Sequence, residues 1–298
     1  MAAGRFIGID LGGTKIEGIV LDEALAPCAR VRVPTEQEGG YEHIVQRVTS
    51  LVTELRGHAP ETRTIGIGAP GSLSARDGRV KNSNTACLNG RRLREDVQDR
   101  VGLGVHLEND ANCFALAEAR TGRGRGCDLV FGVIIGTGVG GGFVHAGRLR
   151  AGPQHIAGEW GHHGIDPAGP ACYCGQRGCV ETLLSGPALE AAHRAAGGPA
   201  CSAAEVGRRA LAGEPAATAA LERYVDCFGR ALANVISIVD PDVVVLGGGL
   251  SNLEVLYTRG RDAVARYVFN DELRTPIVRN MLGDSAGVIG AALLTVPP

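Results

Sequence analysis

The sequence predicts an α/β protein made of two related halves that face a cleft. Strands and helices alternate along its 298 residues, and two stretches share the order strand, glycine turn, returning strand. One of these stretches starts near the N-terminus and the other follows residue 128. A chain of this length fits two domains of about 100–200 residues each.

The first half is expected to alternate in short elements. It reads as strand, returning strand, helix, strand and then strand with helix, at 5–13, 14–22, 39–57, 64–72 and 105–122. The glycine–arginine stretch 122–128, GRGRGCD, reads as a loop between the halves. We therefore expect an N-terminal domain over 1–120, joined by the C-terminal helix 286–298.

The second half, over 121–285, is expected to be larger. It reads as strand, glycine turn, returning strand, cysteine-rich segment and two helical stretches, at 129–136, 137–142, 143–149, 169–181, 187–213 and 216–239. A buried strand then ends in the glycine turn of DPDVVVLGGG (240–249), and a helix, a strand and the terminal helix complete the chain.

The composition excludes several classes of protein. The formal net charge of −2 argues against a nucleic-acid surface, and the longest apolar runs fall short of the ~20 residues that span a bilayer. The N-terminus does not resemble a signal peptide, so a cytoplasmic protein is expected, in which disulfides are unusual. Six of the nine cysteines are scattered singly and are expected to be ordinary thiols: Cys28, Cys87, Cys113, Cys127, Cys201 and Cys227.

Three glycine turns each follow an apolar strand, at 12–14, 136–142 and 247–249. Glycine lets backbone N–H groups approach phosphate oxygens closely. Although GTGVGG (136–141) and GIGAPG (66–71) match G-x-G-x-x-G, neither opens a helix, which disfavours a dinucleotide-binding fold. The Gly-Lys-Ser/Thr of a P-loop is absent from the sequence, so several glycine turns together are the expected nucleotide site.

The motifs IGIDLGGTK, ENDANC, GTGVGGG, GEWGH, CYCGQRGCVE and DPDVVVLGGG together resemble the ROK family of bacterial sugar kinases and related repressors. The resemblance covers nearly the whole chain. It implies an actin/hexokinase-like (ribonuclease-H-like) duplicated two-domain fold with a cleft between domains. It also implies ATP and Mg²⁺ as cofactors, with Asp10 near the metal and the phosphates. The nucleotide contacts it implies are Asp10, Gly12, Gly13, Thr14, Lys15, Gly136, Thr137, Gly138, Gly140, Gly141, Gly247 and Gly248.

Asp110 is the candidate catalytic base. Taken alone, a carboxylate at a helix start reads as a capping residue. Phosphoryl transfer to a sugar needs a carboxylate that orients a hydroxyl and accepts its proton. The resemblance assigns this role to Asp110, and it assigns sugar hydroxyl contacts to Asn109 and Asn84.

The cysteine-rich segment predicts a metal site. A Cys172–Cys174 disulfide would be strained, and a redox pair normally reads C-x-x-C. Three cysteines with one histidine form a set typical of structural Zn²⁺. The sequence offers His162 or His163 beside Cys172, Cys174 and Cys179, and the resemblance selects His162.

The resemblance also places the second nitrogen of His162, and the carboxylates of Glu159 and Glu181, on sugar hydroxyls. It implies a homodimer whose small-molecule partners are a sugar and ATP. The competing hypotheses are a sugar-responsive repressor and an inactive sugar-binding protein. The first is disfavoured because the first strand starts near residue 5, and the second because Asp10 and Asp110 are present. Overall likeness favours the fructokinase (manno-fructokinase) branch, with N-acetylglucosamine kinase and glucokinase as alternatives.

Overall fold

The computed structural model describes residues 4–297, which divide into two compact units. The first unit holds Met1–Thr121, Gly142–Ala157 and Leu282–Pro298, and the second holds Gly122–Gly141 and Gly158–Met281. The C-terminal segment therefore belongs with the N-terminal one.

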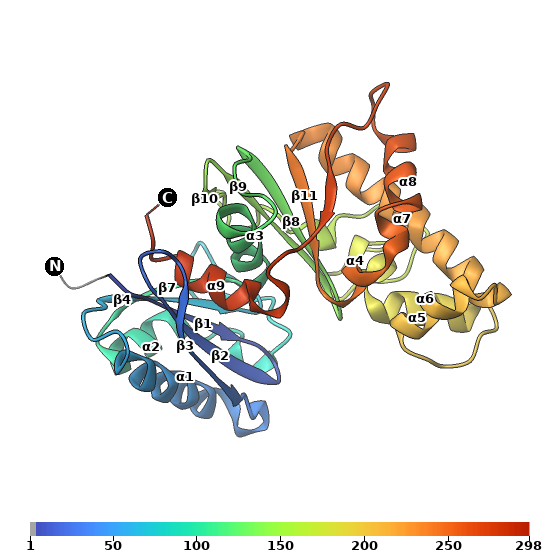
Figure 1. Ribbon diagram of the computed structural model, residues 1–298. Helices are drawn as coiled ribbons and strands as arrows, with labels where there is room; N and C mark the ends of the chain where they lie inside the picture. Colours follow the sequence, from blue (N-terminus) through green and yellow to red (C-terminus); the bar gives the residue numbers. More distant parts are fainter. Residues whose placement is uncertain (1–3, 298) are drawn as a thin grey trace. The chain divides into compact units, whose positions relative to one another are not determined.

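Two five-stranded sheets repeat one plan (Figure 1). The first has the order β3-β2-β1-β4-β7 and the second β10-β9-β8-β11-β12. In the first sheet β2 pairs antiparallel with β1 and β3, whereas β4 and β7 extend it in parallel. The strands are β1 (Phe6–Leu11), β2 (Lys15–Leu21), β3 (Pro27–Pro34), β4 (Thr64–Ala69), β5 (Ser72–Leu73), β6 (Val80–Lys81), β7 (Gly104–Asn109), β8 (Leu129–Ile135), β9 (Val139–His145), β10 (Arg148–Leu149), β11 (Val243–Gly247) and β12 (Ile277–Arg279). This repetition confirms the predicted duplicated α/β fold.

Helices connect the strands. They are α1 (Gly40–Arg56), α2 (Leu93–Val101), α3 (Asp110–Thr121), α4 (Val180–Leu184), α5 (Gly186–Ala195), α6 (Ala203–Leu211), α7 (Pro215–Val239), α8 (Arg259–Tyr267) and α9 (Ala286–Leu293). None of the helices over residues 4–297 is both long and apolar enough to cross a membrane.

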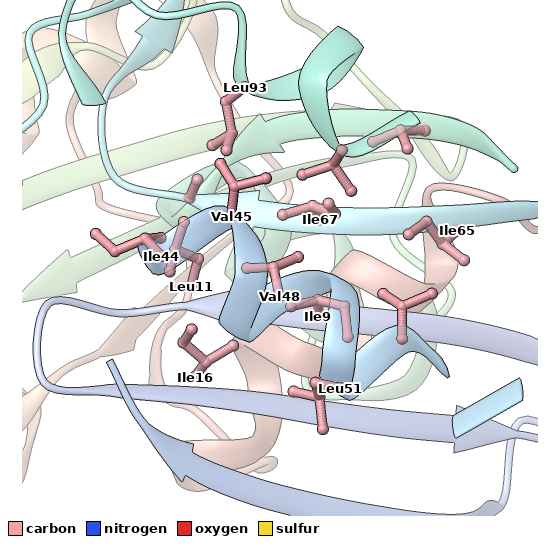
Figure 2. Close-up of a cluster of buried hydrophobic side chains, with 14 of the residues drawn as sticks. Ile9, Leu11, Ile16, Ile44, Val45, Val48, Leu51, Ile65, Ile67 and Leu93 are labelled. Atoms are coloured by element: carbon pink, nitrogen blue, oxygen red, sulfur yellow. The ribbon is translucent and has the colours of Figure 1, made fainter. Parts of the chain in front are cut away.

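The core of the first unit lies between one face of its sheet and α1. Every second residue of β1 and β4 is a large apolar side chain, such as Ile9 and Ile67, and these pack against Ile44, Val48 and other α1 residues (Figure 2). Because strand side chains alternate between faces, the residues between them face the other way.

On that other face the strands carry glycine, which lets α9 lie against the sheet backbone. A Cβ at Gly66 would come within 1.7 Å of the Ala291 carbonyl oxygen, and a Cβ at Gly8 within 2.4 Å of the Ala292 nitrogen. The same face ends in Asp10, so the close packing of α9 brings its first turn to this carboxylate. A Cβ at Gly287 would lie 2.9 Å from Asp10 Oδ2.

Three elements differ from the sequence-based expectation. The predicted helical stretch 187–213 is two helices, α5 and α6, because Gly197 adopts φ +90° and Gly198 and Pro199 follow it. The edge strand β3 and the short helix α2 were not predicted. The apolar pattern of α2 is weak, since of its nine residues only Leu93 and Val97 are buried.

Candidate functional site

In the first unit, Asp10 lies at the end of β1 beside other carboxylates. Burial and, after it, the negative charges of Asp110 and Glu17 together raise the pKa of Asp10 to about 7, although the nearby Lys15 opposes them. Glu17 faces Asp10 across the β1–β2 pair and is almost fully buried. Its carboxylate accepts from Arg30 Nε and, at 2.6 Å, from Arg32 Nε. Among these carboxylates, Asp10 is therefore the one whose ionisation a bound cation would change most.

The junction of β7 and α3 positions Asn109 and Asp110. Asn109 Nδ2 donates to the Gly71 carbonyl at 2.8 Å, and the Ala111 N–H donates both to Asn109 Oδ1 at 2.9 Å and to Asp110 Oδ1 at 2.8 Å. Asn109 thus caps the start of the helix, and the Asp110 carboxylate is held in place at its first residue.

Glu108 is a residue that the sequence analysis missed. Its Oε1 accepts from the Asn109 backbone N–H and from Asn112 Nδ2, both at 2.9 Å. One carboxylate therefore ties the last residue of β7 to the first turn of α3. Its place directly before Asn109 was the only signal in the sequence.

The first glycine turn and Asn84 also belong to the first unit. A hydrogen bond from the Gly12 N–H to the Lys15 carbonyl, at 2.9 Å, closes the turn. Thr35 Oγ1 donates to the Gly12 carbonyl at 2.6 Å. Asn84 is exposed in a loop clamped by two hydrogen bonds between Ser83 and Asn89.

In the second unit, the other two glycine turns lie side by side. β8 and β11 pair in parallel with Ile134 opposite Gly247, so both strands end at one edge of the sheet. Gly248 adopts φ +79°, and a Cβ there would approach the Ile135 carbonyl oxygen to 2.4 Å. The turn from Gly136 and the turn at 247–249 thus meet through backbone contact, with Thr137 exposed.

Glu181 links the cysteine-rich segment to this edge. Its Oε2 accepts from the Val139 N–H at 3.0 Å, next to Gly138. Trp160 Nε1 donates to the Gly140 carbonyl at 2.9 Å, which fixes the turn that follows the exposed Glu159. The residues assigned to the sugar and those assigned to the phosphates are therefore neighbours in the second unit.

The structure brings four possible metal ligands together in one cluster, namely His162, Cys172, Cys174 and Cys179. One possible ligand atom from each lies within 4.8 Å of all the others. Cys172 Sγ is 3.6 Å from His162 Nδ1, and Cys174 Sγ is 3.6 Å from Cys179 Sγ. All nine cysteines are free thiols. Burial raises the pKa of Cys179 to about 12, whereas a backbone hydrogen bond at Gln176 lowers the pKa of Cys174.

The ring orientation separates the two candidate histidines. His163 Nε2 contacts Asn234 Nδ2 at 3.1 Å and is not part of the cluster. His162 presents Nδ1 to the thiols, and its Nε2 meets the Tyr173 hydroxyl at 3.0 Å, with the two rings edge to face. The Tyr173 hydroxyl, which the sequence does not single out, thus contacts the nitrogen that the resemblance assigns to a sugar hydroxyl.

Comparison with known proteins places this geometry in context. A model of the ROK family matches residues 6–296. An N-acetyl-D-glucosamine kinase from Vibrio parahaemolyticus is 36% identical over 301 residues, covering 98% of this chain and 99% of the relative.

Solved structures agree. A ROK hexokinase from Thermus thermophilus superposes with a TM-score of 0.87 at 35% identity, covering 97% of each chain. A ROK glucokinase from Streptomyces griseus, in complex with glucose and AMPPNP, superposes with a TM-score of 0.81 at 30% identity, covering 98% of this chain and 99% of that one. These relatives do not support the fructokinase branch that overall likeness had favoured.

Proposed function

This chain belongs to the ROK family, and we propose that it transfers the γ-phosphoryl group of ATP to N-acetyl-D-glucosamine. Its class, an ATP-dependent hexose kinase, follows from the family match over residues 6–296 and from the kinases among its relatives. The observation that carries the sugar is the end-to-end likeness to an N-acetyl-D-glucosamine kinase. The 35% identity to a hexokinase and the 30% identity to a glucokinase make glucose the second candidate.

Asp110 is proposed as the base that accepts the proton of the attacking hydroxyl. Phosphoryl transfer needs positioning more than a strong base, and the capping contacts of Asn109 and Asp110 hold this carboxylate on a rigid helix start. Asp10 is proposed to face Mg²⁺ and the phosphates. Its raised pKa supports this role, because a divalent cation would stabilise the ionised form that burial disfavours.

Backbone N–H groups of the glycine turns are proposed to hold the ATP phosphates. The adjacency of the Gly136 and Gly248 turns supports this, since two turns at one sheet edge offer converging donors. The first turn, at 12–14, supplies the contacts proposed in the first unit.

A structural Zn²⁺ is proposed on His162, Cys172, Cys174 and Cys179. Three thiols and one imidazole nitrogen, already within 4.8 Å of one another, fit the tetrahedral Cys₃His set. Zinc on Nδ1 would fix the imidazole so that Nε2 carries the hydrogen and can donate to a sugar hydroxyl. The Tyr173 phenol must then leave or share that nitrogen. A homodimer and a cytoplasmic location stay predictions.

The test measures kcat/KM for N-acetylglucosamine, glucose, mannose and fructose at fixed ATP and Mg²⁺. The release of ADP reports the reaction rate. We expect N-acetylglucosamine to lead by about tenfold or more, since pocket groups left unpaired by a wrong sugar cost about 1–3 kcal/mol each. A lead for glucose or fructose would reject the sugar assignment and leave the kinase assignment standing.

A further inference from the structure

A second cluster of reactive side chains lies in the second unit, apart from the zinc cluster. It joins His193 in the last turn of α5, Cys201 in the loop before α6, and Glu214 directly before α7. The sequence alone predicts an ordinary thiol at Cys201. Cys201 and His193 lie 13 and 21 positions before Glu214, and contacts over such separations are not evident from the sequence.

The imidazole of His193 stands between the thiol and the carboxylate. Cys201 Sγ lies 3.5 Å from Nδ1, and Glu214 Oε1 lies 3.2 Å from Nε2. Because a carboxylate accepts, Nε2 carries the hydrogen and Nδ1 is left to accept the thiol proton. The partners occupy opposite nitrogens, so they do not converge on one metal ion. This is the arrangement in which a base, oriented by a third group, activates a thiol.

A cation, Arg209, lies beside the cluster. The pKa of Arg209 is raised, first by its hydrogen bond to Glu205 and then by the negative charges of Cys201 and Glu214. Arg209 also contacts Glu214 Oε2 at 3.4 Å, so the cation and the carboxylate hold each other beside the sulfur.

The helix start adds to this field. Cys201 directly precedes Ser202, whose hydroxyl caps α6, and helix N-termini stabilise thiolates. The opposing charge on this side is Glu190, whose Oε1 accepts from the Ala203 N–H at 2.9 Å. Each nearby carboxylate is therefore already engaged with a donor.

The His193 imidazole is shielded from solvent, whereas Cys201 is partly exposed. The His193 side chain is completely buried, whereas Cys201 is partly exposed between the exposed residues Ala200 and Ser202. The loop covers the ring with Gly198, where a Cβ would come within 2.0 Å of His193 Nε2. Of the two side chains, the partly exposed one is therefore the nucleophile and the buried one is the base.

We propose that Cys201 is an activated thiol and a modification site for small disulfides. The thiol proton moves to His193 Nδ1, and the thiolate attacks one sulfur of a low-molecular-weight disulfide. A new Cys201 S–S bond forms, the disulfide's own S–S bond breaks, and the released thiolate is protonated by solvent, while the imidazolium gives its proton back to solvent. The product is a mixed disulfide, which a free thiol reverses.

The test uses the full-length protein, purified without chelator, and oxidised glutathione as the probe, with peptide mass spectrometry to resolve each cysteine. Cys28 is the internal reference, because it is exposed and its Sγ donates to a backbone carbonyl at 3.9 Å. We expect Cys201 to react about tenfold or more faster than Cys28 near neutral pH. Rates within about threefold of each other would overturn the proposal.

A variant separates activation from simple exposure. Glu214→Gln keeps the size and a hydrogen-bond acceptor but removes the charge that stabilises the imidazolium, so the Cys201 rate should fall about threefold to tenfold while Cys28 is unchanged. Glu222→Gln is the matched control, since Glu222 lies on α7 with its side chain 60% exposed and pairs with Arg259. An unchanged Cys201 rate in a folded Glu214→Gln would contradict the mechanism. If that variant does not fold, the wild-type ratio of Cys201 to Cys28 decides alone.

Discussion

At the scale of single residues, Asp110 gives the sharpest test of the proposed chemistry. Asp110→Asn keeps an oxygen that can accept from the Ala111 N–H, so the start of α3 should survive. The variant loses the proton acceptor, and kcat should fall by about 10²–10⁴-fold. Steady-state kinetics on the best sugar measure this loss.

The control is sugar binding by Asp110→Asn, measured by calorimetry, together with its circular dichroism. Both should match the wild-type protein, because the substitution removes charge and not shape. If kcat instead drops by less than about tenfold in a folded variant, Asp110 serves only to cap its helix.

Asp10 makes stability depend on pH. Its pKa is about 7 in the folded protein against an ordinary 3.8, so between these values the folded state binds a proton that the unfolded chain has released. The free energy of unfolding therefore falls as pH rises through this window. Asp10→Asn has no such proton to lose, so its stability relative to wild type should rise by about 1–3 kcal/mol between about pH 5 and about pH 8.

Urea unfolding at the two pH values, without Mg²⁺ or ATP, measures this difference. Asp271→Asn is the control, because Asp271 is exposed and its variant should track the wild-type protein. A difference between Asp10→Asn and wild type that does not grow with pH would mean that Asp10 is ionised in the folded state throughout.

At the scale of elements, the cysteine knuckle, residues 164–179, is a short segment built mainly of turns. Its bridges join Gly164 to Cys179 and Ala171 to Arg177, and the intervening residues 173–177 are exposed. A metal would therefore supply much of its stability. Cys174→Ser should lower both the bound zinc and the affinity for sugar, since His162 is in the same cluster and Glu181 follows Cys179 by two residues.

Metal analysis of protein purified without chelator tests this prediction, with Cys28→Ser as the matched control. The control should keep about one zinc per chain and unchanged sugar affinity. Wild-type protein that holds well under one zinc per chain would remove the basis of the assignment.

The sequence indicated this knuckle and a C-terminal helix joined to the N-terminal domain, but not how closely α9 approaches the sheet backbone. Three cysteines within eight residues are a local signal, and so are the glycine turns that end β1, β8 and β11. Gly8 and Gly66, in contrast, read only as weak points in strands. Their purpose depends on a helix more than 200 residues away in the chain, which approaches their bare backbone. The contacts of Tyr173 with His162 and of Cys201 with His193 likewise become visible only in three dimensions.

At the scale of the whole molecule, the residues proposed to bind sugar fall in both units. Asn109 and Asp110 belong to the first unit, and Glu159, His162 and Glu181 belong to the second. A ligand that binds only the folded protein stabilises it by RT ln(1 + [L]/Kd), whatever the number of contacts. Thermal unfolding can therefore rank sugars without any turnover.

N-acetylglucosamine at a hundredfold excess over its Kd should add about 2.7 kcal/mol, which corresponds to several degrees in Tm for a protein of this size. Fructose at the same concentration should add far less if the proposed sugar is right, because its ring offers no N-acetyl group. The measurement is a melting curve with each sugar and a nonhydrolysable ATP analogue, and Asp110→Asn should show the same shifts. Equal shifts for both sugars would mean that the pocket does not distinguish them in the ground state. Any selectivity seen in kcat/KM would then arise in the transition state alone.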